Sequence, residues 1–446
     1  MSGGDRGPCP EPGPDTAGER SGRRRRLART VEVMSTFNPS GPIPGRRRRR
    51  VALAVAALTG LVLLAAAGCA DFSSEASTFT VQPSLTAPAA VPQDPSADLT
   101  SSTAPSPTGS STPPSTPSGA QQPADPCAPT DEAVIATCLS APWGLAPLPD
   151  GQSALVGERT TGRILQVAKG QDPVLVTKIA GVDAAGDGGL LGITLSPSYD
   201  EDGLIYAYVT TAKDNRIIRI ARGDVPKAIF TGIPRGRKHN GGRIAFAADR
   251  SLYVGTGDTG NRALAAKPAS LAGKVLRLNE FGKPAKGNPT PGSPIYARGF
   301  TQVAGLCPLE DGTVAALDQR GKKDVLLPLA AGRDYATPAS GGALWTWTAA
   351  EGGAADCAVD SGLLASTSLA KQQLTGIQMA SGGTFTGTPT VLLDKRYGRL
   401  LTVVSSDQGL LWLTTSNKDG AGKPVPSDDR VIVVPSGSSG GAGGPD

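Results

Sequence analysis

The chain has 446 residues, with 58 glycines, 39 prolines and only 4% aromatic residues, a composition typical of a turn-rich β protein with additional segments that do not fold. Residues 1–50 hold 12 of the 44 lysines and arginines and only 5 of the 39 acidic residues, which leaves 32 basic and 34 acidic side chains in the remainder. The net charge of +5 therefore belongs to the amino terminus, and the foldable part gives no electrostatic argument for binding nucleic acid.

Residues 1–50 are rich in glycine, proline and arginine, and we predict that they are disordered. The arginine runs 23–26 and 46–50 are of a kind often found in nucleic-acid-binding tails. The second run, however, directly precedes the apolar segment 51–67, which ends at small residues before Cys69. This order predicts an export signal over residues 51–69. A membrane-spanning anchor is the alternative, because about 17 apolar residues lie at the lower limit for spanning a bilayer.

Residues 70–126 are rich in serine, threonine, proline and alanine and have almost no large apolar side chains. Such a segment cannot bury a core, so we predict a disordered linker there. The folded domain is expected over residues 127–435, and residues 436–446 are expected to form a disordered tail. Whether residues 51–69 form an export signal or a membrane-spanning anchor, we expect the domain to be tethered at the extracytoplasmic face of the cell membrane.

A weak internal repeat organises the folded domain. Each unit has a glycine-led strand, an aspartate-containing turn and a second strand, and the first three glycines, Gly144, Gly192 and Gly242, are spaced 48 and 50 residues apart. About 310 residues provide six such units of about 50 residues, which predicts an all-β, six-bladed β-propeller. A β-sandwich also has short strands, but it does not account for the repeat.

Four cysteines fall in the folded domain, at positions 127, 138, 307 and 357. An oxidising compartment favours two disulfides, for which three connectivities exist. We favour Cys127–Cys138 with Cys307–Cys357, because the first pair closes a short loop. A metal site is the alternative, although no CxxC spacing supports it.

The segment 239–279 begins with His239, the only histidine of the chain, and continues with an asparagine and two glycines. It predicts strands over residues 243–247, 251–256 and 274–278, with a Gly-Asp turn over residues 257–260. One titratable imidazole thus stands at the start of a small antiparallel sheet.

The HNGG sequence at 239–242, the TGD turn, the sequence LAGKVLRLN and the segment 186–209 closely resemble the glucose/sorbosone dehydrogenase family. Members of that family are soluble quinoproteins built as six-bladed propellers, and they use pyrroloquinoline quinone (PQQ) and Ca²⁺ to oxidise sugars. The resemblance implies that His239 is the general base, a role that suits imidazole because it titrates near neutral pH. A structural or surface histidine is the alternative.

The resemblance also implies residues near the cofactor. Asp187 stands where the family has Gln or Glu beside the quinone, and a simple turn aspartate is the alternative. Lys371 resembles a lysine that contacts the quinone, and Arg396 and Arg399 resemble an arginine pair at its acidic edge. Solvent-exposed charges are the alternative for all three.

The pattern of the family is broken at residues 300–302, where Phe-Thr-Gln replaces His-Arg-Asn and Gln302 takes the position of the asparagine. The bidentate grip of an arginine on a cofactor carboxylate is therefore missing at position 301. The segment 317–324 carries three cations where the family helps to build its Ca²⁺ site, although Ca²⁺ requires several oxygen ligands.

The sequence Ala66-Ala67-Gly68-Cys69 resembles a bacterial lipobox, which implies that Cys69 becomes the lipidated amino terminus. The whole chain resembles an actinobacterial lipoprotein of the LppZ type.

Two functions follow. The first is a PQQ-dependent oxidoreductase that acts on the CH–OH groups of a sugar or related alcohol. The second is a non-catalytic cell-surface propeller that binds a glycan, a lipid or a protein. With one histidine and no nucleophile elbow, a Ser/His/Asp hydrolase is set aside, and no phosphate-binding glycine loop is present.

Overall fold

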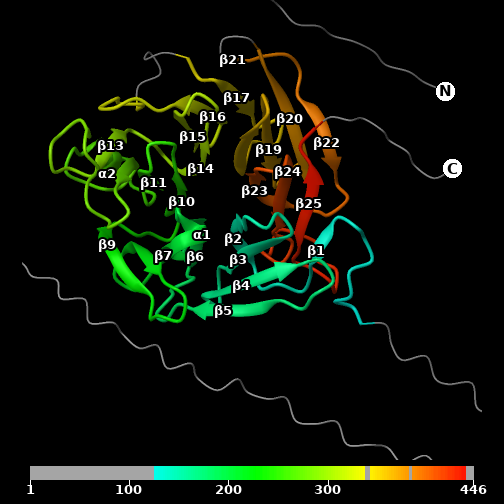
Figure 1. Cartoon of the computed structure of the whole chain (residues 1–446). Coiled ribbons are helices and arrows are strands. Elements are labelled where there is room, and N and C mark those ends of the chain that lie inside the picture. Colours follow the sequence, from blue (N-terminus) through cyan, green and yellow to red (C-terminus); the bar gives the residue numbers. More distant parts are fainter. Residues whose placement is uncertain (1–124, 337–341, 381–383, 438–446) are drawn as a thin grey trace, which may run out of the picture. The chain divides into compact units, whose positions relative to one another are not determined.

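The computed structural model describes residues 125–336, 342–380 and 384–437, and it shows six β-sheets arranged around a common centre (Figure 1). The prediction of an all-β, six-bladed propeller is confirmed. The predicted signal segment, Cys69 and most of the linker lie outside the described residues, as does most of the predicted tail. Within the described ranges no helix is long and apolar enough to cross a membrane.

Each sheet is antiparallel, and in the first five sheets the strand that comes first in the chain lies innermost. The first sheet consists of β2 (Pro142–Pro147), β3 (Ser153–Glu158), β4 (Arg163–Ala168) and β5 (Val174–Lys178). The second consists of β6 (Leu190–Leu195), β7 (Ile205–Thr210), β8 (Asn215–Ile220) and β9 (Lys227–Ile233). The third consists of β10 (Gly241–Phe246), β11 (Leu252–Thr256), β12 (Lys274–Leu278) and β13 (Ile295–Arg298).

The remaining sheets follow the same plan. The fourth consists of β14 (Val303–Pro308), β15 (Val314–Gln319), β16 (Lys323–Pro328) and β17 (Trp345–Thr348). The fifth consists of β18 (Asp356–Asp360), β19 (Leu363–Ser368) and β20 (Gln373–Ala380), and β20 pairs with both β21 (Thr384–Phe385) and β22 (Thr390–Asp394). Two short helices, α1 (Tyr199–Asp202) and α2 (Arg262–Ala266), lie in connections.

The sixth sheet closes the ring with strands from both ends of the domain. It consists of β23 (Leu400–Ser406), β24 (Leu410–Thr415), β25 (Val431–Pro435) and, at its outer edge, β1 (Val134–Ala136). In the register of this last pair Val134 lies opposite Ile432. The six inner strands contact one another in cyclic order, including β23 with β2, so the ring is complete.

At the repeat glycines Gly144 and Gly192, neighbouring inner strands approach each other closely. A β-carbon added at Gly144 would lie 2.4 Å from the carbonyl oxygen of Leu191, and one at Gly192 would lie 2.4 Å from that of Gly242. Only glycine fits such a contact between backbones. The spacing of these glycines in the sequence therefore reflects the packing of neighbouring sheets around the axis.

Apolar side chains fill the spaces between adjacent sheets. Between the first and second sheets, for example, Leu155 and Ile164 pack with Ile193 and Ile205. Strand β7 is buried over its whole length, whereas the outer strand β5 is largely exposed. In the first and second sheets, the second strands β3 and β7 are thus fully buried, and the outermost strands β5 and β9 are the most exposed.

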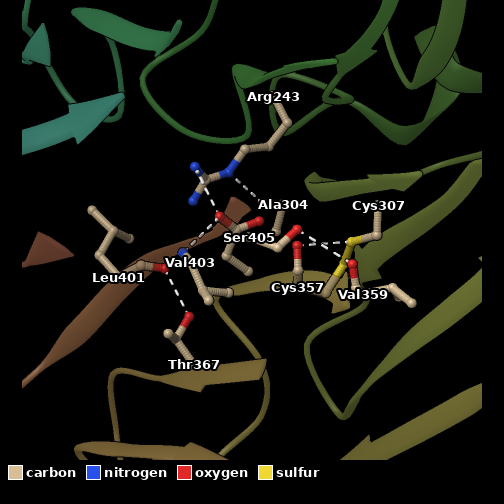
Figure 2. Close-up of a disulfide and its surroundings, with 10 residues drawn as sticks. Arg243, Ala304, Cys307, Cys357, Val359, Thr367, Leu401, Val403 and Ser405 are labelled. Atoms are coloured by element: carbon tan, nitrogen blue, oxygen red, sulfur yellow. Dashed lines mark hydrogen bonds and ion pairs between the residues drawn. A yellow bond between two sulfur atoms is a disulfide. The ribbon is translucent and has the colours of Figure 1, made fainter. Parts of the chain in front are cut away.

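An arginine from β10 joins several sheets across the axis (Figure 2). The Nε atom of Arg243 donates to the carbonyl oxygen of Ala304 at 2.7 Å, and its Nη1 atom donates to Thr402 Oγ1 at 3.0 Å. Nη1 also lies 3.1 Å from Asp356 Oδ2, and the guanidinium stacks 3.9 Å from the ring centroid of Trp143. The sheets that supply these partners are the fourth, sixth, fifth and first.

Both expected disulfides are present, and the favoured connectivity is confirmed. Cys127 pairs with Cys138 at a sequence separation of 11, and Cys307 pairs with Cys357 at a separation of 50. The second bond joins the inner strands β14 and β18 close to Arg243 (Figure 2). It therefore links two adjacent sheets of the ring.

The two disulfides should differ in their contribution to stability. In the chain-entropy model, the longer closed loop of Cys307–Cys357 predicts a loss of about 4 kcal/mol on replacement of both cysteines by serine, against about 3 kcal/mol for Cys127–Cys138. Urea unfolding of the two double variants under non-reducing conditions measures this difference. An equal or reversed order would contradict it.

The ion pair at the axis should make stability depend on pH. Burial raises the pKa of Asp356 to about 6, although the charge of Arg243 opposes the shift. The folded chain therefore holds this proton more tightly than the unfolded chain, and the unfolding free energy should fall by roughly 2–3 kcal/mol as pH rises from about 4 to about 6.

Asp356→Asn should remove this part of the pH dependence. It should also cost roughly 3–5 kcal/mol at neutral pH, because the buried guanidinium loses its counter-charge. Urea unfolding across this pH range measures both effects, with Asp172→Asn at an exposed position as the control that keeps the wild-type profile. A slope unchanged in Asp356→Asn would assign the dependence to other groups.

Candidate active site

Three of the predicted site residues meet at one face of the ring. Asp187, His239 and Gln302 each stand shortly before an inner strand, and the inner strands all begin at the same end of the axis, here called the His239 face. Asp187 Oδ2 accepts a hydrogen bond from the backbone N–H of His239 at 2.6 Å. Gln302 Oε1 accepts from the N–H of Gly241 at 3.0 Å. The loops of three neighbouring sheets are thus bonded together around His239.

His239 is paired with a buried carboxylate. Its Nδ1 atom lies 2.8 Å from Asp258 Oδ1, and the two side chains are 34% and 5% exposed. When Asp258 is ionised it can only accept, so Nδ1 then carries the hydrogen, and in the neutral imidazole Nε2 keeps its lone pair. The sequence alone indicated only a turn at Asp258, because the two positions of the pair are separated by two strands of a hairpin.

The loop that carries His239 is fixed by Asn240. Its Oδ1 atom accepts from Gly236 N at 2.9 Å and from Asn215 Nδ2 at 3.1 Å, and its carbonyl oxygen accepts from the hydroxyl of Tyr208 at 2.8 Å. Asn240 is 1% exposed, and these bonds satisfy its buried oxygen atoms within the protein. His239 itself has a φ of 57°, an uncommon left-handed conformation held by this network.

A buried lysine fixes the segment that follows Asp258. Lys274 is fully buried, and its amine donates to the carbonyl oxygens of Ala265 at 2.7 Å and Ala272 at 2.9 Å. Burial lowers the pKa of Lys274 to about 8. Because Ala265 belongs to α2, which begins directly after the 257–260 turn, the lysine ties this helix and its turn to the third sheet.

A second buried carboxylate lies in the fourth sheet. Asp318 Oδ1 accepts from the N–H groups of Thr301 and Gln302, both at 2.9 Å, and Oδ2 lies 2.7 Å from Arg320 Nε. Burial raises the pKa of Asp318, although Arg320 and the hydrogen bonds act against this. Both carboxylate oxygens are therefore engaged within the protein.

The described residues do not contain a metal site of the usual kind. No group of three or more His, Cys, Asp or Glu side chains in these ranges is placed to hold an ion. In the segment 317–324, where the family pattern places part of its Ca²⁺ site, the carboxylate of Asp318 is paired with Arg320. These side chains do not fit Ca²⁺, which requires several free oxygen ligands.

An arginine that sequence analysis did not single out reaches the altered position 301. Arg262, the first residue of α2, donates from Nη1 to Thr301 Oγ1 at 3.0 Å. A guanidinium is thus present in space where the family pattern places one in sequence. A second arginine, Arg159, lies beside Asp187, since its Nη1 atom donates to the carbonyl oxygens of Gly186 and Gly188 on either side of it.

The three late cations have different surroundings. Arg399 directly precedes β23, donates to the carbonyl oxygen of Leu369 at 3.3 Å and pairs with Asp419 at 2.8 Å. Lys371 is exposed in the turn that follows Leu369. Arg396 pairs instead with Asp131 at 2.8 Å. Arg399 therefore contacts the turn that carries Lys371. Among the described residues, Arg396 makes no contact with His239.

Known proteins are similar to this chain in sequence and in fold. Residues 139–341 match the family model described as Glucose / Sorbosone dehydrogenase. The PQQ-bound aldose sugar dehydrogenase of Streptomyces coelicolor is 38% identical, with a TM-score of 0.63, over 67% of this chain and 95% of that one. This chain belongs to the glucose/sorbosone dehydrogenase family.

Further members of the glucose/sorbosone dehydrogenase family are less similar. A Thermus thermophilus protein described as an oxidoreductase (glucose dehydrogenase) is 32% identical with a TM-score of 0.61, over 68% of this chain and 98% of that one. Quinoprotein glucose dehydrogenase B of Acinetobacter calcoaceticus is 29% identical over 44% of this chain and 49% of its own length. The chain spans about half the length of the curated relatives it matches.

Proposed function

We propose that this chain is a sugar dehydrogenase that binds PQQ and oxidises a CH–OH group of a sugar or related alcohol, with His239 as the general base. The observation that carries the proposal is the pairing of His239 with the buried Asp258 at the His239 face. The relatives named as glucose or aldose sugar dehydrogenases support the reaction class.

The pair can act as a proton acceptor. The substrate hydroxyl donates its proton to His239 Nε2, and Asp258 holds the ring through Nδ1 and stabilises the imidazolium that forms. The hydrogen bond from the His239 backbone to Asp187 fixes the position of the ring relative to the second sheet. When bound, PQQ would accept the hydride removed from the sugar.

The residues present fit a quinone that bears carboxylates. Arg262 and Arg399 offer guanidinium donors, which bind carboxylates strongly. The amide nitrogen of Gln302 has no partner among the described residues, because only its oxygen is bonded to Gly241. The described residues do not fit Ca²⁺, because both carboxylate oxygens of Asp318 are already bonded within the protein. We therefore give Ca²⁺ no part in the reaction.

We further propose that the protein is exported and anchored through a lipid on Cys69 at the extracytoplasmic face of the cell membrane, as in the LppZ-type lipoproteins. The basic, apolar and small-residue order of segment 46–69 supports this. Two disulfides in the propeller are consistent with an oxidising compartment.

A second candidate is a non-catalytic cell-surface propeller that binds a glycan, a lipid or a protein. The observation that favours it is the replacement of the family pattern at Thr301 and Gln302, together with the Asp318–Arg320 pair in the segment of the family's Ca²⁺ site.

Cofactor binding distinguishes the two candidates. Calorimetric titration should show PQQ binding at micromolar concentration, and Arg262→Gln should weaken it about tenfold or more, since a hydrogen bond to a charged group contributes about 1.5–3 kcal/mol. Lys267→Gln, at an exposed position just beyond α2, is the matched control and should bind as the wild type does. No binding at micromolar PQQ would favour the non-catalytic candidate.

The role of His239 has its own test. In a dye-linked assay of sugar oxidation, His239→Gln should lower kcat by about 10²–10⁴-fold, because it removes positioned proton transfer, while PQQ affinity stays within a few-fold of the wild type. A wild-type rate in this variant would refute the assignment.

A further inference from the structure

A cavity of about 410 Å³ lies along the axis at the end opposite the His239 face. Its lining comes from the inner strands and from the turns that follow them, including the segments 147–149 and 405–408. These residues stand at the ends of inner strands, whereas His239 stands before the beginning of one. The cavity is therefore separate from the proposed active site.

The deep end of the cavity is closed by the axial arginine. Arg243, Asp356 and Thr402 all contribute to the lining, and all three stand early in their inner strands. Arg243 is 7% exposed, and its Nη2 atom has no hydrogen-bond partner among the described residues. The deep end therefore holds a buried charged pair.

The open end carries polar side chains with unused hydrogen-bonding capacity. Thr194, Asp407 and Gln408 line the cavity, and no side-chain hydrogen bond of theirs is found in the described ranges. Ser405 and Ser406 bind backbone oxygens only weakly, at 3.3 and 3.5 Å. Hydroxyl, amide and carboxylate groups thus surround the opening (Figure 2 shows Ser405).

The walls combine apolar side chains with free strand edges. Leu145, Ile193 and Ile244 contribute apolar surface. Each inner strand is hydrogen-bonded to a sheet neighbour on one side only, so its other edge turns N–H and C=O groups toward the axis. Such a lining offers both donors and acceptors beside apolar patches, as small-molecule sites do.

The charge and the size of the cavity restrict the ligand. The ionisable side chains in the lining are Arg243, Asp356 and Asp407, which sum to one negative charge when all are ionised and so disfavour an anion. Hydroxyl groups both donate and accept, and they match a lining of this mixed character. A volume of about 410 Å³ lies in the range of small-molecule sites.

We propose that this axial cavity is a second binding site, which takes a neutral saccharide of one or two sugar units. The site holds the sugar at the end of the propeller away from His239, so binding there involves no proton or hydride transfer. The proposal does not rest on the proposed dehydrogenase activity, because none of its residues belongs to the His239 face.

Saturation-transfer NMR and calorimetry on the full chain, with D-glucose and maltose as probes and D-glucuronate as the anionic comparison, test the proposal. The neutral sugars should bind at millimolar concentration or better, and D-glucuronate at least several-fold more weakly. Ser406→Trp, which fills the opening, should weaken binding at least tenfold. Gln171→Trp is the matched control, because Gln171 is exposed in the turn between the outer strands β4 and β5 and does not line the cavity.

His239→Gln separates this site from the active site, since the part of the sugar binding that Ser406→Trp removes should persist in His239→Gln even where turnover is lost. If Ser406→Trp does not fold, as judged by its thermal unfolding, the pair Thr194→Val and Gln408→Ala should still weaken binding several-fold. Sugar binding lost in His239→Gln and kept in Ser406→Trp would overturn the second site and leave the proposed function standing. Absence of binding to the wild type at about 10 mM sugar would also overturn it.

Discussion

The buried guanidinium of Arg243 is the constraint on which the ring depends. A charge at the axis is costly unless it is paired and hydrogen-bonded. Its partners Ala304, Asp356, Thr402 and Trp143 come from four different sheets, so they meet only when the ring is closed. The arrangement adds little net stability, because burial also makes the charge of Asp356 unfavourable and raises its pKa. Its effect is to favour the closed ring over open arrangements of the same sheets.

The closed ring also determines where chemistry can occur. Inner strands that run in the same direction bring the loops before them to one end of the axis, so Asp187, His239 and Gln302 meet although they are far apart in sequence. The turns after the same strands meet at the other end and surround the axial cavity. Arg243 lies between the two ends. One set of strands thus builds both the His239 face and the axial cavity.

The sequence predicted the features that depend on local pattern. The glycine repeat indicated the contacts between inner strands, and the cysteine spacing favoured the two disulfides that are present. The contacts His239–Asp258 and Arg262–Thr301 could not be predicted, because they depend on how the 257–260 turn and α2 fold back over the third and fourth sheets. The axial position of Arg243 could not be predicted either, since in the sequence it is an ordinary residue of a strand that begins near a repeat glycine.

The altered positions of the site are mutually consistent. Asp318 accepts from the backbone of Thr301 and Gln302, Gln302 accepts from Gly241, and Arg262 donates to Thr301. A site that had lost its function without constraint would be expected to contain buried polar groups left unpaired by unmatched substitutions, each at a cost of about 1–3 kcal/mol. Among the described residues, the unpaired buried side-chain atoms do not include any from this network. The substituted positions are therefore bonded to one another beside His239, while the amide nitrogen of Gln302 keeps a donor without a partner among the described residues, which argues for a retained and modified site.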